Sequence, residues 1–235
     1  MKTRQYGLTM VELMVSLVLS LFLILVAAQF FIANKSTYRT QQAQADVQER
    51  GRFAISWLGQ QIRQAGYVSN SQIASAFDVQ YPVVNASGTT LAMAASQLFA
   101  GTSATLQLRV RGADDGNIVD CQGQGMSAAS AVTQIISRNG NSLSCDGTEV
   151  VPGVTQLVFE YGRDTSNDRI PDVYVSAPTA SGIYAIRVCM VVQSLENNVA
   201  PSAVSFTDCA GNASTTSNNM IAKVFRTSVY VRNAP

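Results

Sequence analysis

The sequence contains no histidine, and only 13% of its residues are charged. The lack of histidine excludes the hydrolase arrangements that use a histidine base and every metal site with an imidazole ligand. The chain also has no glycine-rich phosphate-binding loop, and nothing in it identifies the two converging carboxylates of a glycosidase. The sequence therefore favours a structural or interaction protein over an enzyme, and it implies no cofactor.

Charges of the two signs are nearly balanced, with 16 Lys and Arg against 15 Asp and Glu. This balance gives no reason to expect nucleic acid or a strongly acidic surface as a partner. Abundant Ser, Thr, Asn, Gln and Ala fit a secreted surface and are typical of a protein that packs against copies or relatives of itself. At 235 residues, the chain can bury one sizeable core in addition to a membrane anchor.

One long stretch lacks charge altogether: from Leu13 to Asn34 no side chain is ionisable. As a helix it would be roughly 33 Å long, enough to cross a hydrocarbon core. Lys2 and Arg4 precede it, and such positive charges stay on the cytoplasmic side. The sequence therefore predicts one membrane-spanning helix, with the large remainder of the chain on the other side.

Glu12 lies just inside this apolar segment. An ionised carboxylate within the bilayer costs several kcal/mol unless a partner neutralises it. Cleavage after Gly7 would create that partner, the new α-amino group of Leu8, four residues before Glu12. Gly7 suits cleavage because a residue without a side chain lets a peptidase approach the backbone closely.

The stretch from Tyr6 to Leu13, followed by an apolar helix, resembles the class III leader of type IV pilins and type II secretion pseudopilins. The resemblance implies that a prepilin peptidase cuts between Gly7 and Leu8 and methylates the new N-terminus at Leu8. It also implies that Glu12 is the assembly glutamate at the fifth mature position. The family favours Phe where this chain has Leu8, a mild departure because the site accepts other apolar residues.

Two other interpretations of the N-terminus compete. An ordinary secretory signal could be cut after Ala28, before Gln29, but Glu12 and the length of the apolar run argue against it. A plain signal anchor explains the length but gives Glu12 no role. We therefore prefer the prepilin interpretation.

The predicted helix becomes amphipathic after the membrane segment. Gln41 to Gln64 contains good helix formers, and Gly66 is a plausible stop. If it is continuous from Leu8, the helix is on the order of 85 Å long. Its apolar face is formed by Val47, Ala54, Leu58, Ile62 and Ala65, with Phe53 and Trp57 beside it.

Gly51 and Gly59 lie inside this helix, where each costs about 1 kcal/mol relative to Ala. We expect them to let the helix approach a sheet closely, and we prefer this to a role in bending.

The segment from Glu49 to Tyr67, with its Glu-Arg-Gly-Arg-Phe-Ala start and Ala-Gly-Tyr end, resembles PilW-type minor pilins. Lys223 to Asn233 is similar to the final strand of those subunits. The resemblance implies a low-abundance subunit that primes type IV pilus assembly in an inner-membrane and tip complex of minor pilins. The partners that it implies are other minor pilins, the major pilin, prepilin peptidase, the inner-membrane assembly machinery and a tip adhesin.

The same resemblance places the protein in the inner membrane of a Gram-negative bacterium, as a single-pass protein with its C-terminal domain in the periplasm, and then in the surface pilus. Two alternatives remain open. A type II secretion minor pseudopilin has the same leader and helix. A membrane-anchored or secreted binding domain that never polymerises is the alternative from another class.

After Tyr67 the sequence changes to short alternating runs, which predict antiparallel strands. Ala104 to Arg111 alternates clearly, with Leu106, Leu108 and Val110 expected inward and Gln107, Arg109 and Arg111 outward. Further strands are expected at Val154–Tyr161, Asp172–Ser176, Tyr184–Gln193 and Ile221–Arg232, and long loops at Ser69–Ala76, Gly112–Gly125 and Asn197–Asn219.

The predicted fold is α+β and type IV pilin-like, with a long N-terminal helix packed on an antiparallel β-sheet domain. The predicted divisions are the leader at 1–7, the transmembrane and filament-core helix at 8–34, the amphipathic helix at 35–66 and the extracytoplasmic β-rich domain at 67–235.

The four cysteines are an even number in a compartment that favours disulfides. Of the three pairings, we prefer Cys121 with Cys145 and Cys189 with Cys209, because each closes one local excursion of the chain. A zinc site has little support, since no two cysteines are closely spaced and histidine is absent.

A loop rich in aspartate follows the strand that ends near Tyr161, and relatives of this type can carry a calcium loop here. This copy lacks alternating carboxylates and glycine, and Arg169 and Pro171 interrupt it. A solvated hairpin turn is therefore preferred to a calcium site at Asp164, Asp168 and Asp172.

Overall fold

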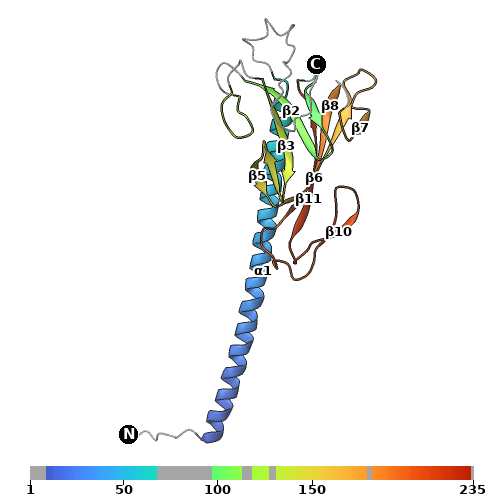
Figure 1. The fold of residues 1–235 in the computed structure, drawn as a ribbon. Helices are drawn as coiled ribbons and strands as arrows, with labels where there is room; N and C mark the ends of the chain where they lie inside the picture. The colour runs from blue at the N-terminus through green and yellow to red at the C-terminus, as the bar shows by residue number, and fades with distance from the viewer. Residues whose placement is uncertain (1–8, 68–96, 113–117, 127–130, 179–181, 234–235) are drawn as a thin grey trace.

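The protein consists of one long helix that carries a β-rich domain on its C-terminal half, while its N-terminal half extends away from the domain (Figure 1). The computed structural model describes residues 9–67, 97–112, 118–126, 131–178 and 182–233. The described residues form this helix, two larger antiparallel sheets and a small hairpin. This is the α+β architecture that the sequence predicts, a long N-terminal helix packed on an antiparallel β-sheet domain.

Helix α1 (Met10–Gln64) is continuous for 55 residues, or about 82 Å. Thr9 caps its N-terminus, where the hydroxyl oxygen accepts a hydrogen bond from the Glu12 amide at 3.3 Å. At the other end Ala65 donates its amide to the Gln61 carbonyl, and Gly66 follows with φ +71°. The predicted stop at Gly66 is confirmed, because this left-handed conformation suits glycine.

Two antiparallel sheets make up most of the domain. The five-stranded sheet has the order β1 (Phe99–Gly101), β2 (Thr105–Arg111), β3 (Ala131–Asn139), β4 (Ser142–Cys145) and β5 (Thr148–Pro152). The four-stranded sheet has the order β11 (Ala222–Tyr230), β8 (Ile183–Gln193), β6 (Val154–Arg163) and β7 (Val173–Val175). The strands predicted from the alternating runs are thus confirmed.

A two-stranded hairpin pairs β9 (Ser205–Thr207) with β10 (Ala213–Thr215). It lies within Asn197–Asn219, which the sequence predicts as a long loop, so that prediction is wrong where the two strands form. Each strand of the hairpin has two exposed residues and one half-buried residue. The apolar alternation that marks a strand packed on a core is therefore absent from this segment.

The amphipathic half of α1 packs on the four-stranded sheet, with its expected apolar face buried. Gly51 is necessary for this contact, because a Cβ built there would lie 2.1 Å from the Phe225 ring on β11. A Cβ at Gly59 would meet only the Arg63 guanidinium of the same helix, at 3.2 Å. The predicted close approach is thus confirmed at Gly51 and is wrong at Gly59.

Strand β2 differs from its prediction on one face. Leu106 and Leu108 are fully buried as expected, but Gln107 and Arg109, expected to point into solvent, are only 3% and 1% exposed. Alternation assigns side chains to two faces, but it does not tell whether the second face is covered. Here both faces of β2 are shielded from solvent between Leu106 and Val110.

The two larger sheets are joined through a buried tyrosine. Tyr161 on β6 reaches the first sheet, and its hydroxyl lies within hydrogen-bonding distance of the carbonyls of Ala100, Thr102 and Thr105. Burial raises the pKa of Tyr161 well above its ordinary value, so the hydroxyl keeps its proton and remains a donor.

Candidate functional site

Glu12 lies in the first turn of α1, with its backbone held by the Thr9 cap. Its side chain is exposed, and within the described residues it forms no ion pair. Thr9 and Glu12 have the Thr-x-x-Glu spacing of a capping box. Gly7 and Leu8, the predicted cleavage and methylation positions, lie outside the described residues.

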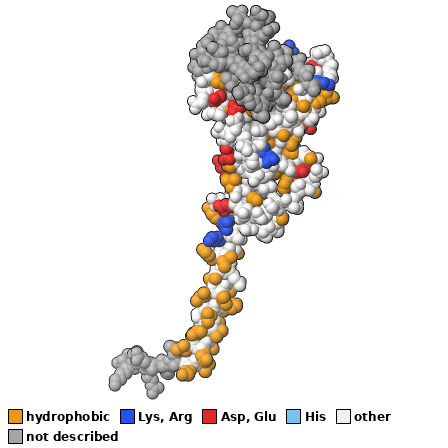
Figure 2. Space-filling model, viewed as in Figure 1, with side chains coloured by type: hydrophobic (Ala, Val, Ile, Leu, Met, Phe, Trp, Pro, Cys, Tyr) orange, Lys and Arg blue, Asp and Glu red, His pale blue; other side chains and the backbone are white. Residues whose placement is uncertain are grey.

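The N-terminal half of α1 is an apolar rod that touches no part of the described domain. Hydrophobic side chains cover it on the face seen in Figure 2, and its large apolar residues from Met10 to Ile32 are all about half exposed or more. This stretch is long and apolar enough to cross a membrane, by length and composition. An exposed apolar surface of this size needs a lipid or protein environment.

The other half of α1 is fixed to the domain by polar contacts. Arg50 donates to the carbonyl of Pro152 at 2.9 Å and pairs with Asp46 at 2.7 Å. Near the helix end, the Asn233 side-chain amide donates to the carbonyls of Arg63 and Ala65. The contacts with the domain come from the five-stranded sheet and the C-terminal segment, so the domain holds the exposed rod in one orientation.

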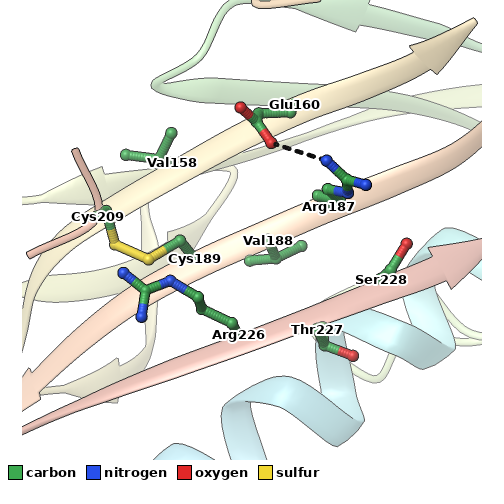
Figure 3. Close-up of a pocket in the computed structure, with 9 residues that line it drawn as sticks. All are labelled: Val158, Glu160, Arg187, Val188, Cys189, Cys209, Arg226, Thr227 and Ser228. Carbon is green, nitrogen blue, oxygen red and sulfur yellow. Dashed lines mark ion pairs between the residues drawn. A yellow bond between two sulfur atoms is a disulfide. The ribbon is translucent and has the colours of Figure 1, made fainter. Parts of the chain in front are cut away.

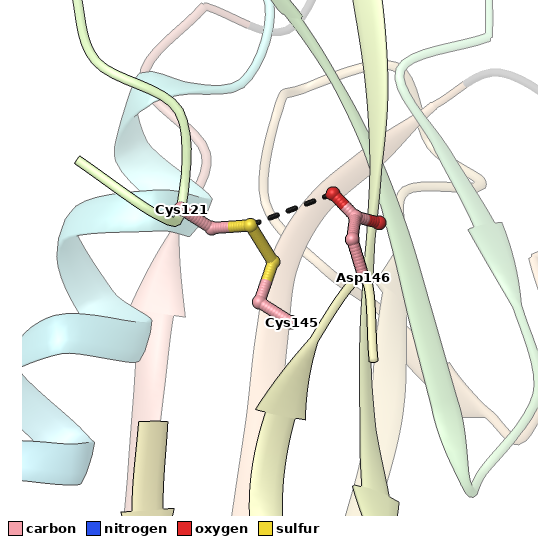
Figure 4. Close-up of side chains that lie close together, drawn as sticks. All are labelled: Cys121, Cys145 and Asp146. Atoms are coloured by element: carbon pink, nitrogen blue, oxygen red, sulfur yellow. Dashed lines mark hydrogen bonds between the residues drawn. A yellow bond between two sulfur atoms is a disulfide. The ribbon is translucent and has the colours of Figure 1, made fainter. Parts of the chain in front are cut away.

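The disulfide between Cys121 and Cys145 ties the segment after β2 to the end of β4. Asp146 lies beside it in a left-handed conformation, with one carboxylate oxygen 3.6 Å from Cys121 Sγ (Figure 4). Burial raises the pKa of Asp146, the Ile135 amide opposes this, and the charge of Asp120 adds to it. A disulfide sulfur has no proton to donate, so a hydrogen bond at this contact requires a proton on the Asp146 carboxyl.

The second disulfide joins Cys189, in the middle of β8, to Cys209 between β9 and β10. It fastens the hairpin to the sheet face opposite α1. Cys209 is further held through its amide, which donates to the Gln156 side chain at 3.1 Å. Both disulfides have the pairing preferred from the sequence.

The aspartate-rich turn after β6 is held by its own carboxylates. Asp164 accepts backbone amides from Asn167 and Arg169, each at 2.7 Å, and both of these residues have positive φ. Partial burial raises the pKa of Asp164, but the amides outweigh this, and the net pKa is lowered. Hydrogen bonds from the backbone and side chain of Thr165 lower the pKa of Asp172.

Asp168 accepts the Ile170 amide, so each of the three aspartates considered as calcium ligands accepts a backbone amide of the turn. Among the described residues, the one cluster with three potential metal ligands in reach of each other is that of Cys121, Cys145 and Asp146. Its two sulfurs are already bonded to each other. The turn geometry thus supports the solvated hairpin that the sequence favours.

Comparison with known proteins finds type IV pilus proteins at both ends of the chain. Residues 122–233 match the family model described as type IV pilus-assembly protein W, and residues 2–28 match the prokaryotic N-terminal methylation motif. The chain is thus similar to PilW-type pilus assembly proteins, which are structural proteins rather than enzymes.

Two further comparisons were with solved structures and with curated proteins. A type IV-like pilin from Thermus thermophilus aligns with 58% of this chain and 84% of its own, at 11% identity and a TM-score of 0.40. No curated protein matches the chain.

The sheet face turned away from α1 has a shallow pocket of about 400 Å³ (Figure 3). The Arg187 guanidinium lies over the Tyr174 ring at 3.4 Å and 4.0 Å from Glu160. Arg226 donates to the carbonyl of Asp208 at 2.7 Å. Both arginines are therefore engaged within the protein.

Sequence reasoning found Glu12, the cysteines and the aspartate turn, but it missed the contacts that fix the helix. Arg50 and Pro152 lie about a hundred positions apart, and Arg63 and Asn233 are even farther apart in sequence. Nothing local in the sequence marks such pairs.

Proposed function

We propose that this protein is a minor pilin that primes type IV pilus assembly as part of an inner-membrane complex of minor pilins and remains at the pilus tip. The observation that carries the proposal is the joining, in one chain, of a methylation motif and a PilW domain through one unbroken helix. A subunit built this way can exchange the bilayer for a bundle of similar helices without changing its fold.

The proposed processing removes residues 1–7 and leaves an N-methylated Leu8 at the start of the helix. Residues 8–34 first span the inner membrane and then enter the filament core, and residues 35–66 lie on the periplasmic domain, residues 67–235. Prepilin peptidase and the inner-membrane assembly machinery are the partners for these steps.

In the filament core, the Leu8 ammonium of one subunit would meet the Glu12 carboxylate of a neighbour. A subunit out of register would leave a buried charge without a partner, which costs several kcal/mol. The exposed position of Glu12 in the single chain supports this role, because its side chain is accessible to a neighbouring subunit.

The first test is the intact mass and N-terminal sequence of the protein isolated from its native membrane. A start at N-methyl-Leu8 supports prepilin processing, whereas a start at Gln29 indicates a secretory signal and removes the filament mechanism.

A second test separates the pilus from the secretion system. Deletion of the gene should abolish surface pili while type II secretion continues, and the wild-type gene should restore piliation. Loss of secretion with normal pili would instead identify a minor pseudopilin.

A further inference from the structure

The last strand of the domain has a long free edge. Strand β11 lies at one side of the four-stranded sheet, next to β8, and no further strand pairs with it within the described residues (Figure 3). The other outer strands, β1, β5, β7, β9 and β10, have three to five residues, whereas β11 has nine. Natural proteins usually shorten or cover such an edge, because it offers hydrogen bonds to any other extended chain.

The register of β11 shows which of its backbone groups point outward. The residues that flank the strand both bond to the β8 side: the Ser194 amide donates to the Ile221 carbonyl, and the Val231 amide donates to the Tyr184 carbonyl. The register between them has no bulge, and an antiparallel ladder uses alternate residues, so the odd-numbered residues bond to β8. The amides and carbonyls of the even-numbered residues therefore point away from the sheet, at Ala222, Val224, Arg226, Ser228 and Tyr230. None of these outward groups has a hydrogen-bond partner among the described residues.

Helix α1 runs along β11 in the same direction. Near the start of the strand, Lys223 donates a hydrogen bond to the Gln48 side chain at 2.8 Å. Beyond its end, the Asn233 side chain donates to the Ala65 carbonyl at 3.0 Å. One flank of the helix therefore follows the strand over its whole length.

The flank of α1 with Gln48 faces the free edge. Gln48 and Arg50 point to opposite sides of the helix; Arg50 contacts the turn before β6, and Gln48 contacts β11, on the other side of β8. Ile55 and Gly59 lie within about 20° of Gln48 around the axis. Ile55 is only half-buried, and the atoms nearest to a Cβ built at Gly59 belong to the flexible Arg63 side chain. An added strand would thus meet an apolar side chain and a helix surface that a small movement of Arg63 uncovers.

The free edge is basic. From Ala222 to Arg232 the sequence contains Lys223, Arg226 and Arg232 and no acidic residue. On the helix flank, Arg63 is exposed and forms no ion pair within the part of the chain that the structure describes. An acidic strand would place carboxylates beside these cations, whereas β11 of a second copy would bring cations together. The charge at the edge therefore disfavours self-pairing and favours a partner of opposite sign.

We propose that β11 binds an acidic, extended segment of another protein, which adds to the four-stranded sheet as a further antiparallel strand beneath the flank of α1. The acidic side chains of this segment lie beside Arg226 on the face turned away from the helix, and its apolar side chains face Ile55. Its backbone completes the hydrogen bonds that the outward residues of β11 leave unmade. The inference concerns the domain alone and does not rest on the proposed priming function.

The probe for the test is a fluorescein-labelled peptide in which glutamate and valine alternate over the length of β11. Its binding to the full chain in detergent micelles is measured by fluorescence anisotropy. In antiparallel pairing, peptide residues opposite Arg226 and Ser228 share the face of these side chains and donate their amides to β11. Glutamate at these positions meets the cation, and valine then faces the helix.

Backbone methylation of the peptide separates strand pairing from simple charge attraction. N-methylation of the glutamate amides should abolish binding, because these amides point at β11. N-methylation of the valine amides should leave binding intact, because these amides point away from it. No binding of the parent peptide, or equal binding of the two methylated peptides, would overturn the proposal.

Ser228→Pro tests the edge from the protein side. Proline removes an amide that points outward and is tolerated on an outer strand, so the fold should remain, which Trp57 fluorescence checks. Binding of the parent peptide should be lost in Ser228→Pro and kept in Ser228→Ala. Binding that persists in folded Ser228→Pro would locate the peptide elsewhere and contradict strand addition.

Arg226→Gln tests the preference for acidic partners, because glutamine keeps a donor for the Asp208 carbonyl. It should weaken binding of the glutamate peptide several-fold and leave that of a threonine–valine peptide nearly unchanged. A lysine–valine peptide should bind wild type several-fold more weakly than the glutamate peptide, and equal binding would overturn the choice of an acidic partner. Dimerisation of the chain that Ser228→Pro prevents would also overturn it, by identifying a second copy as the occupant.

Discussion

The packing of α1 against β11 allows a specific prediction, because its two buried glycines, Gly51 and Gly59, have different neighbours. Gly51→Ala places a methyl group 2.1 Å from the Phe225 ring, so the ring or the helix must move. Gly59→Ala places its methyl group 3.2 Å from the end of the flexible Arg63 side chain, which can move away at little cost. We expect Gly51→Ala to be clearly the less stable of the two variants.

The comparison isolates the clash, because each variant gains the same helix propensity, about 1 kcal/mol for replacing Gly by Ala. Overpacking costs typically about 1–3 kcal/mol, and this is the expected difference between the two variants. For a chain of this size it corresponds to a difference in Tm of about 2–12 °C.

Trp57, the one tryptophan, packs against the hydrophobic core and reports unfolding by its fluorescence. Adding Phe225→Leu should shrink the gap between the two glycine variants, because the smaller side chain leaves room for the methyl group. Equal stability of Gly51→Ala and Gly59→Ala in the native background would refute the reasoning.

Three other predictions concern the assembly residue, the hairpin and the aspartate turn. Glu12→Ala should reduce surface piliation while cleavage of the leader, read by mass spectrometry, continues; normal piliation would contradict the proposed role. Replacing Cys189 and Cys209 together by Ser should cost about 3 kcal/mol, from a bridge between residues 20 positions apart, and should expose the β9–β10 hairpin to protease. Because the pKa of Asp172 is lowered below 3.8, its contribution to stability is present above that pH and is lost as the pH falls further. Asp172→Asn should therefore be less stable than wild type at pH 7, and the deficit should shrink as the pH falls; an equal deficit at pH 7 and pH 2 would show that charge is not involved.

Helices and strands whose apolar residues recur at regular spacing could be predicted from the sequence. The charge-free run and the apolar face that follows it predict one helix, since nothing before Gly66 interrupts it. The long strands around Phe159 and Val188 also show themselves by alternation. Strand β4 (Ser142–Cys145) does not, because all four of its residues are buried and no alternation exists. The alternation of apolar and polar residues thus reveals a strand or helix only where one face is exposed to solvent and the other is buried.

The candidate site divides in a similar way. Glu12 could be found because a carboxylate in an apolar run is conspicuous, and the cysteine pairs because each flanks a local excursion of the chain. The role of Gly51 could be guessed, but its partner Phe225 could not, since that contact joins residues far apart in sequence. Arg109 was assigned to solvent because a charged side chain on an alternating strand usually points there, and here tertiary packing overrides that tendency.

The unbroken helix connects the two ends of the proposed mechanism. Apart from the exposed ion pair of Arg39, Thr40 is the first residue of α1 with a hydrogen bond to the domain. The helix axis rises by about 42 Å from Glu12 to Thr40. Since the domain is fastened to the helix at Thr40, Arg50 and Ala65, any axial position set at Glu12 is transmitted to the domain with little loss. In the proposed filament, a slip of one helical turn at Glu12 would shift the domain by about 5.4 Å and misplace all of its contacts with neighbours. One buried charge pair can therefore set the position of a whole subunit, provided that no hinge interrupts α1, and the structure has none between Met10 and Gln64.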